Sequence, residues 1–403
     1  MSLNYIDLFA GCGGLSLGLY NAGWHGLFAV EKNADAFLTL STNLLEKKKH
    51  YSWPSWLSKS SLDIYEVIKT HSTELRKLRG QVSLVVGGPP CQGFSMAGRR
   101  KANDARNELF TAYLDFIRLV QPDTLLFENV HGFTVAFADE SGCKGEAYSK
   151  KITDALEEEG YVTYSKLIDM SEYGVPQRRK RFILVASKSF APIEFFERLE
   201  KNKISFLSSK NLTAPVTIKD AIGDLLMANG TVDCPDFPNF KSGQYGKAES
   251  TYQKYMRIGV SEKIPNSHRF AKHKNETVDI FKKLMETSEK SQRYTPKTFE
   301  GLKKRSVSVT KADTICPTVT SIPDDLIHYC EPRIPTVREV ARIQSFPDWY
   351  EFKGQYTTGG DRRKVDVPRY TQVANAVPPL FAEQVGLVLK ELIEDGREIA
   401  LQS

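Results

Sequence analysis

The stretch VSLVVGGPPCQGFS (82–95) joins a short, β-branched apolar run to a pair of glycines and a pair of prolines. The run over 82–86 is typical of a buried parallel strand that ends in a tight turn. Pro89 and Pro90 each restrict a backbone φ angle, so the turn that follows the strand is stiff. The stretch therefore predicts that Cys91 stands in a defined orientation at the carboxyl end of a buried strand.

Cys91 has two interpretations. A cysteine in apolar surroundings is most often an inert small hydrophobic side chain. Here the glycines and prolines before it and the loop over 92–95 after it favour a nucleophile, because nucleophiles of α/β enzymes stand on tight turns at strand ends. The chain has five other cysteines, but no CxxC pair and no histidine at zinc-finger spacing. A disulfide framework and a bound metal are therefore not expected.

Strands and helices alternate along the first half of the chain. Further strands are expected at 5–9, 26–30, 124–127 and 181–186, with helices at 34–46, 107–120 and 147–159. This pattern predicts an α/β fold with a parallel sheet, in which ligands bind at the carboxyl ends of the strands. Those ends carry the turn at Gly11, Glu31, Cys91 and Glu128, so four strand ends are expected to share one cleft.

The turn AGCGG (10–14) follows the first strand, and Glu31 ends the second strand 20 residues after Gly11. In sheets that bind dinucleotides, an acidic residue at this place accepts the hydroxyls of a ribose, while the glycines let the ligand approach a helix N-terminus. The pattern indicates a nucleotide-like cofactor. An ordinary structural turn is the alternative, because glycine-rich turns are common.

The length and charge distribution suggest a second domain. A chain of 403 residues exceeds the roughly 250–300 at which single cores stop growing. Residues 238–312 carry 17 basic and 7 acidic side chains, a net charge of +10, whereas the whole chain has +6. Such a segment is typical of a domain that binds a polyanion, and a solvated lysine-rich face is the alternative. Regular helices are expected again at 336–343 and 378–392.

With these features assembled, the chain resembles the DNA methyltransferases that act on carbon 5 of cytosine, of bacterial or phage type. Six segments in the family's order carry the resemblance: DLFAGCGG (7–14), GGPPCQGFS (87–95), ENV (128–130), QRRKRFILVA (177–186), TVREVARIQSFPD (336–348) and QVANAVPP (372–379). The resemblance implies a Rossmann-like catalytic domain over 1–190 and 335–403, with helices on both faces of its sheet. A smaller, irregular target-recognition domain is expected over 191–334.

The resemblance also implies S-adenosylmethionine as the methyl donor, with no metal. Phe9 would lie on the adenine, Gly11 and Gly13 would admit the methionine part, Glu31 would hold the ribose, and Asp63 would accept the adenine amino group. The other cofactor residues implied are Asp7, Gly14, Pro89, Leu109, Asn375 and Ala376, the last two closing the pocket.

The chemistry follows from the substrate. Carbon 5 of cytosine is a poor nucleophile until a thiolate adds to carbon 6, and Cys91 would supply that thiolate. Glu128 would protonate N3 during this addition, which requires a carboxyl whose pKa is raised by burial. Arg181 would hold the cytosine carbonyl oxygen, and Arg179 would help to hold Glu128 and the base. Taken singly, Glu128 could be a helix cap or a surface ion pair, and the arginines a solvated strand edge.

A base stacked in a duplex cannot reach such a site, so the cytosine is expected to flip out of double-stranded DNA. Gln92, Ser95, Arg99 and Arg100 would contact the flipped base and the gap that it leaves, while lysines of the basic segment hold phosphates. The chain starts six residues before its first cofactor motif. This favours a prokaryotic or phage enzyme that is paired with a restriction endonuclease. A monomer is expected, because one chain supplies every part.

Three alternatives remain open. RNA cytosine methyltransferases carry a Thr-Cys nucleophile, and transfer-RNA relatives carry a Cys-Phe-Thr triplet; neither is present in this chain. A catalytically silent DNA-binding paralogue is disfavoured by the retention of both Cys91 and Glu128. A nicotinamide oxidoreductase would leave the Pro-Pro-Cys turn unexplained. No apolar stretch approaches the roughly 20 residues that span a bilayer, and no signal peptide is present, so a cytoplasmic, nucleoid-associated protein is expected.

Overall fold

The structure is a computed structural model that describes residues 3–89, 106–136, 146–302, 304–357 and 366–402. The chain divides into two compact units. Unit 1 comprises Met1–Asp169, Lys180–Lys203 and Ala382–Ser403, and unit 2 comprises Met170–Arg179 and Ile204–Phe381.

Unit 1 is built on a six-stranded sheet in the order β2-β1-β3-β4-β6-β5. The strands are β1 (Asn4–Leu8), β2 (His25–Val30), β3 (Leu84–Gly87), β4 (Thr124–Val130), β5 (Val162–Asp169) and β6 (Lys180–Ser187). The first four are parallel to one another, whereas β6 runs antiparallel to both β4 and β5. The sheet is therefore mixed, with its parallel half at the N-terminal side of the sequence.

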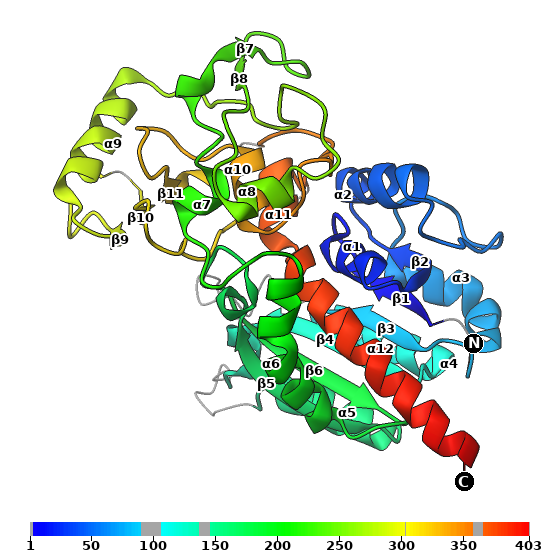
Figure 1. Cartoon of the computed structure of the whole chain (residues 1–403). Helices are drawn as coiled ribbons and strands as arrows, with labels where there is room; N and C mark the ends of the chain where they lie inside the picture. The colour runs from blue at the N-terminus through cyan, green and yellow to red at the C-terminus, as the bar shows by residue number, and fades with distance from the viewer. Residues whose placement is uncertain (1–2, 90–105, 137–145, 303, 358–365, 403) are drawn as a thin grey trace, which may run out of the picture. The chain divides into compact units, whose positions relative to one another are not determined.

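Helices cover both faces of this sheet (Figure 1). One face packs on α3 (Ile64–Lys77), α4 (Arg106–Val120) and α5 (Tyr148–Glu158) through a single buried apolar cluster. The other face carries α1 (Gly14–Asn21), α6 (Pro192–Ser209) and α12 (Pro379–Gln402). Helices α1 and α12 touch so closely that a Cβ at Gly18 would lie 2.3 Å from the Cβ of Ala382. Helix α12, at the end of the chain, therefore belongs with α1 to unit 1.

The predicted α/β fold with helices on both faces is confirmed, and two expectations are corrected. The sheet is not purely parallel, because β5 and β6 form an antiparallel hairpin at its edge. The sequence analysis also missed β5 and α6. Strand β5 is an edge strand whose side chains are mostly exposed, so it lacks the apolar run that marked the inner strands. The helix expected over 34–46 is α2 (Ala34–Leu40), continued by a π-helical turn over Ser41–Lys47.

Unit 2 consists of short elements. Its helices are α7 (Ile218–Ile222), α8 (Thr251–Met256), α9 (Asn275–Thr287), α10 (Val337–Ile343) and α11 (Arg369–Asn375). Its strands form a two-stranded sheet of β7 (Thr231–Asp233) and β8 (Lys241–Gly243), and a three-stranded sheet of β9 (Gln292–Tyr294), β10 (Val307–Val309) and β11 (Leu326–Ile327). Helix α10 begins in a capping box between Thr336 and Glu339.

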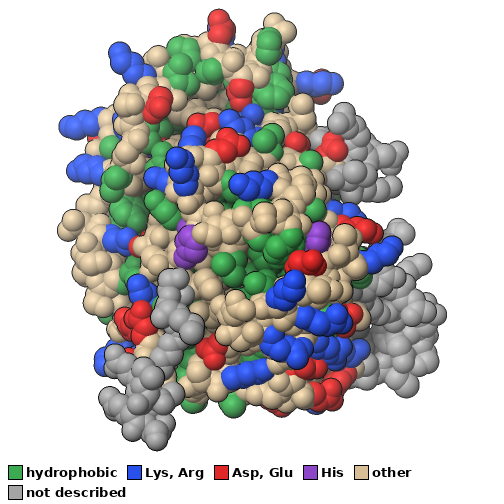
Figure 2. Space-filling model, turned by 90° about the vertical axis from the view of Figure 1, so that its right-hand side faces the viewer, with side chains coloured by type: hydrophobic (Ala, Val, Ile, Leu, Met, Phe, Trp, Pro, Cys, Tyr) green, Lys and Arg blue, Asp and Glu red, His purple; other side chains and the backbone are tan. Residues whose placement is uncertain are grey.

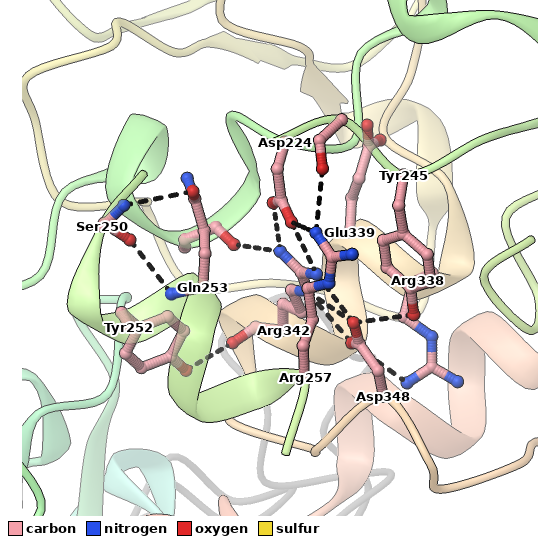
Figure 3. Close-up of polar contacts among 12 residues, drawn as sticks. Asp224, Tyr245, Ser250, Tyr252, Gln253, Arg257, Arg338, Glu339, Arg342 and Asp348 are labelled. Atoms are coloured by element: carbon pink, nitrogen blue, oxygen red, sulfur yellow. Dashed lines mark hydrogen bonds and ion pairs between the residues drawn. The ribbon is translucent and has the colours of Figure 1, made fainter. Parts of the chain in front are cut away.

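A buried ion-pair network surrounds Arg342 of α10 (Figure 3). Its Nη2 donates to Asp348 Oδ2 at 2.7 Å and to Asp224 Oδ2 at 3.1 Å, and all three side chains are fully buried. The Tyr245 hydroxyl donates to Asp348 at 2.8 Å, and the Tyr252 hydroxyl donates to the Arg342 carbonyl oxygen at 2.7 Å. Arg342 thus ties α10 directly to Asp224, 118 residues earlier in the chain, and to Tyr252. Tyr245 joins the network through Asp348.

The bounds of unit 2 differ from those of the predicted target-recognition domain. Residues 335–381, expected in the catalytic domain, belong to unit 2, and residues 191–203 belong to unit 1. The network around Arg342 explains the first difference, because it ties α10 to Asp224. The predicted bounds followed the positions of sequence motifs, whereas the compact units are defined by which residues pack together.

Removal of Asp224 tests the network. Asp224→Ala leaves the buried Arg342 guanidinium short of one carboxylate, so the free energy of unfolding is expected to fall by about 3–5 kcal/mol. Urea unfolding followed by tryptophan fluorescence measures this change. Asp233→Ala is the matched control, because it removes an exposed aspartate paired with Lys241. The control should leave the midpoint unchanged, and equal shifts in the two variants would contradict the role of the network.

Candidate active site

Two glycines bring three strand ends into direct backbone contact. Gly87 has a φ of 124°, and a Cβ there would lie 1.9 Å from the carbonyl oxygen of Leu8 at the end of β1. A Cβ at Gly88 would lie 2.0 Å from the carbonyl oxygen of Glu128 in β4. Neither position can therefore carry a side chain without moving a strand. Where the chain leaves β3, its backbone therefore contacts β1 on one side and β4 on the other.

The turn that leads to the candidate nucleophile is anchored to β4. Asn129 Nδ2 donates to the carbonyl oxygen of Pro89 at 3.2 Å, and both residues are buried. The sequence analysis did not assign a function to Asn129, although it lies in the quoted ENV segment. Cys91 follows two residues later and lies outside the described residues, as do Gln92, Ser95, Arg99 and Arg100.

Glu128 pairs with Arg181 at the end of β4. Arg181 Nε lies 3.0 Å from Glu128 Oε1, and the two side chains are 12% and 18% exposed, so each keeps a small accessible edge. The register of β4 and β6 explains this pairing. Arg181 lies opposite Val130 and Glu128 lies opposite Ile183, so Arg181 and Glu128 are diagonal neighbours on the same face of the sheet. A carboxyl held in this way presents its second oxygen to a ligand, beside a guanidinium that can donate to an anionic or carbonyl oxygen.

Arg179 was expected to help hold Glu128, and the structure gives that contact to Arg181. Arg179 lies in unit 2, is almost fully buried, and donates through Nη2 to the carbonyl oxygens of Ala374 (3.0 Å) and Ala376 (3.1 Å). It therefore holds the end of α11 and the chain just after it. Asn375 and Ala376, the residues expected to close the cofactor pocket, belong to the segment that Arg179 holds.

Glu31 is bound to the glycine turn. Its Oε2 accepts a hydrogen bond from the Gly11 N–H at 2.9 Å, and its Oε1 accepts one from the Asn33 N–H at 2.7 Å. Burial raises the pKa of Glu31, while these backbone donors lower it. Gly11 and Gly13 both have positive φ, and a Cβ at Gly11 would meet nothing within 4 Å. The turn thus offers open space next to an oriented carboxyl group.

The remaining predicted cofactor residues are distributed around this turn. Asp63 caps α3 by accepting from the Tyr65 N–H at 2.9 Å, and it pairs with Lys32 at 2.7 Å. The backbone places it near Glu31, because the Leu62 N–H donates to the Glu31 carbonyl oxygen at 2.7 Å.

Four further predicted residues flank the strand ends and α1. Phe9 adopts a φ of 57°, is half-buried, and packs with Leu109 against the cluster beneath the sheet. Gly14 begins α1, and Pro89 is buried at the end of the described segment after β3.

Asp7 lies deeper than its prediction as a cofactor residue suggests. Only 1% of it is exposed, and its Oδ2 accepts from the Ser16 hydroxyl of α1 at 2.5 Å. Burial raises the pKa of Asp7 to about 7, and the nearby Glu31 carboxyl adds to the rise. Sequence reasoning missed Ser16, for which the spacing gave no signal. Asp7 can act on a ligand at the turn through its charge and through α1, because its side chain has almost no free surface.

Comparison with known families identifies the family of this chain. Residues 3–391 match the family model described as C-5 cytosine-specific DNA methylase. The chain belongs to this family. As a family member it is an S-adenosylmethionine-dependent DNA (cytosine-5) methyltransferase, and the predicted identity and enzyme class are confirmed.

Curated relatives of this methylase cover nearly its whole length. The type II methyltransferase M.XorII of Xanthomonas oryzae is 30% identical over 94% of this chain and 83% of its own. M.DdeI of Desulfomicrobium norvegicum is 30% identical over 94% and 87%, and M1.HphI of Haemophilus parahaemolyticus is 31% identical over 96% and 86%.

Solved structures show the same fold. A protein from an Escherichia coli prophage, assigned as a DNA modification methyltransferase, matches with a TM-score of 0.66 and 24% identity, covering 98% of this chain and 100% of that one. The Dnmt2 methyltransferase of Schizosaccharomyces pombe matches with a TM-score of 0.55 and 14% identity, covering 98% and 99%.

Two structural features are absent from the described part of the methylase. No helix there is long and apolar enough to cross a membrane. The same residues contain no group of three His, Cys, Asp or Glu side chains arranged to hold a metal ion.

Asp7 gives the methylase a testable pH dependence. Its pKa is about 7 in the folded protein and 3.8 when unperturbed, so between these values the folded state binds more protons than the unfolded state. Its contribution to stability therefore falls as the pH rises from about 4 to about 7. Asp7→Asn should flatten the pH dependence of Tm over this range, measured without cofactor. Asp115→Asn, an exposed change of the same kind, should not, and equal slopes for Asp7→Asn and wild type would contradict the assignment.

Proposed function

We propose that this methylase modifies one cytosine of a specific site in double-stranded DNA, as the protective partner of a restriction endonuclease. The observation that carries the proposal is the Arg181–Glu128 pair at the end of β4, beside the wedged Gly88 and the turn that leads to Cys91. The names of the relatives, all type II methyltransferases, support the restriction-modification setting.

The residues around the glycine turn fit S-adenosylmethionine. Glu31 offers a carboxylate to the ribose hydroxyls, and the space over Gly11 admits the methionine part. Asp63 and Phe9 would contact the adenine. When bound, S-adenosylmethionine supplies an electrophilic methyl group. The chain's own residues then have to orient the cytosine and control its protons.

Cys91 would act as the nucleophile. Its thiolate forms a bond to carbon 6 of cytosine, and the electron pair of the 5,6 double bond moves onto the ring. Glu128 gives a proton to N3 as this charge develops, and Arg181 orients Glu128 and donates to the cytosine carbonyl oxygen. After methylation of carbon 5, that carbon loses its proton to solvent, and the electron pair left behind re-forms the 5,6 double bond as the bond from Cys91 to carbon 6 breaks. The proton on N3 returns to Glu128. The thiolate, the double bond and the carboxyl are thereby restored.

The DNA would be held by unit 2. Most lysines of the basic segment 238–312 are exposed, among them Lys247, Lys263 and Lys274, and can bind phosphates. On the face shown in Figure 2, Lys and Arg side chains are interspersed with Asp and Glu. This mixture favours binding through a few oriented contacts over a uniform basic surface. The target cytosine would leave the duplex, with Gln92, Ser95, Arg99 and Arg100 closing around it.

Methyl transfer provides the direct test. With labelled S-adenosylmethionine, the wild-type protein should produce 5-methylcytosine in duplex DNA and leave transfer RNA unlabelled. Cys91→Ala should reduce transfer to background, because it removes the nucleophile that adds to carbon 6. Glu128→Gln should lower the rate by about 10²–10⁴-fold, the usual share of a general acid.

The matched control is Cys330→Ala, which removes an exposed cysteine outside the quoted motifs and should retain full activity. Label in RNA alone would change the substrate class. No transfer to DNA of varied sequence, with S-adenosylmethionine still bound, would favour a silent DNA-binding protein.

A further inference from the structure

A chain of hydrogen bonds runs from the glycine turn of unit 1 to the segment after the π-helical turn. The Ser16 hydroxyl donates to Asp7 Oδ2 at 2.5 Å and lies 2.6 Å from the Tyr51 hydroxyl. The Tyr5 hydroxyl lies 3.3 Å from that of Tyr51 and 2.7 Å from Nε2 of His50. Five side chains from β1, α1 and residues 50–51 therefore form one polar path, in which Tyr51 is half-buried and the other four are buried.

When Asp7 is ionised, each hydroxyl has only one O–H to donate, and this fixes which group donates in every hydrogen bond of the path. Ser16 spends its single O–H on Asp7, so its oxygen must accept from the Tyr51 O–H. The Tyr51 oxygen then accepts from Tyr5, and the Tyr5 oxygen accepts from an N–H of His50. Burial lowers the pKa of His50 to about 3, so the ring is neutral and donates through Nε2. Every donor in the path points toward the carboxylate.

Tyr51, the middle member of this path, is held rigidly by its contacts with β2. A Cβ at Gly26 would lie 2.4 Å from Tyr51 Cδ1, so its ring packs directly on the backbone of β2. The backbones of Gly26 and Tyr51 form a bridge, and the Ser52 N–H donates to the Gly26 carbonyl oxygen at 2.9 Å. The Trp53 ring lies 5.8 Å from that of Tyr51. The hydroxyl is thus placed by the sheet and cannot turn away.

The groups that face Asp7 leave its charge uncompensated. Ser16 approaches from α1, Tyr51 from the segment after the π-helical turn, and Tyr5 from the same strand, while the Glu31 carboxyl at the end of β2 adds a like charge. None of the lysines and arginines that the structure describes forms an ion pair with Asp7. Two carboxyl groups therefore lie on neighbouring strands by the turn, where a cationic ligand would be favoured.

We propose that Tyr51 and Ser16 are positioning residues for the methyl donor, and that they set the preference of the site for S-adenosylmethionine over its demethylated product. The donor carries a sulfonium charge that the product has lost, so a correctly oriented carboxylate at Asp7 favours the donor. The inference rests on the proposed cofactor site at the glycine turn. Neither positioning residue needs to touch the ligand.

Isothermal titration with each ligand tests the proposal. Tyr51→Phe keeps the ring on Gly26 and removes only the hydroxyl, so the Kd for S-adenosylmethionine should rise about fivefold, the effect of one lost hydrogen bond. The Kd for S-adenosylhomocysteine should change by less than about twofold. In turnover, KM for the donor should rise while kcat stays the same. Ser16→Ala breaks the same link from the other side and should give the same ratio.

Tyr113→Phe is the matched control, because Tyr113 is a buried tyrosine of unit 1 whose hydroxyl has no hydrogen-bond partner among the described residues. It should leave both Kd values unchanged. The double variant of Tyr51 and Ser16 should be no worse than either single variant, because the link is serial. Equal weakening of both ligands, or no change in either, would overturn the positioning role. A wild-type protein that binds neither ligand would overturn the cofactor site as well.

Discussion

The site depends on two positions that have no side chain. At Gly87 and Gly88 the chain passes so close to the backbones of β1 and β4 that any Cβ would overlap a carbonyl oxygen. This contact draws together the end of β1, which continues into the glycine turn, and the end of β4, which carries Glu128. The proposed donor site and the proposed base site are therefore neighbours because of backbone packing, before any side chain contributes.

The antiparallel hairpin at the edge of the sheet has an equally specific effect. Arg181 lies at the start of β6, and Glu128 lies near the end of β4. Were β6 parallel to β4, its start would lie beside Thr124 and Arg181 would be several residues away from the carboxyl. The antiparallel direction of β6 therefore places Arg181 beside Glu128. The direction of β6 was also the main error in the predicted sheet.

Local patterns were enough to predict much of this molecule, and tertiary contacts account for the rest. Strands β1 to β4 were recognisable because each contains a short apolar run whose side chains are mostly buried. Strand β5 was not, because it is exposed, and the direction of β6 depends on a hairpin that periodicity does not encode. The link between Tyr51 and Ser16 joins residues 35 positions apart and carries no motif. The nucleophile itself lies outside the described residues, so Cys91 rests on its sequence context and family.

The buried Arg342 limits how such an enzyme can acquire a new target site. Its charge is balanced by Asp348, close by in the sequence, and by Asp224, which lies 118 residues earlier, within the predicted target-recognition domain. A recognition segment transferred from a relative must therefore bring a carboxylate to the place of Asp224, or the host helix is left with an unmatched cation in its core. An exchange of target specificity between these enzymes therefore has to preserve the charge balance of the buried arginine as well as supply new base contacts.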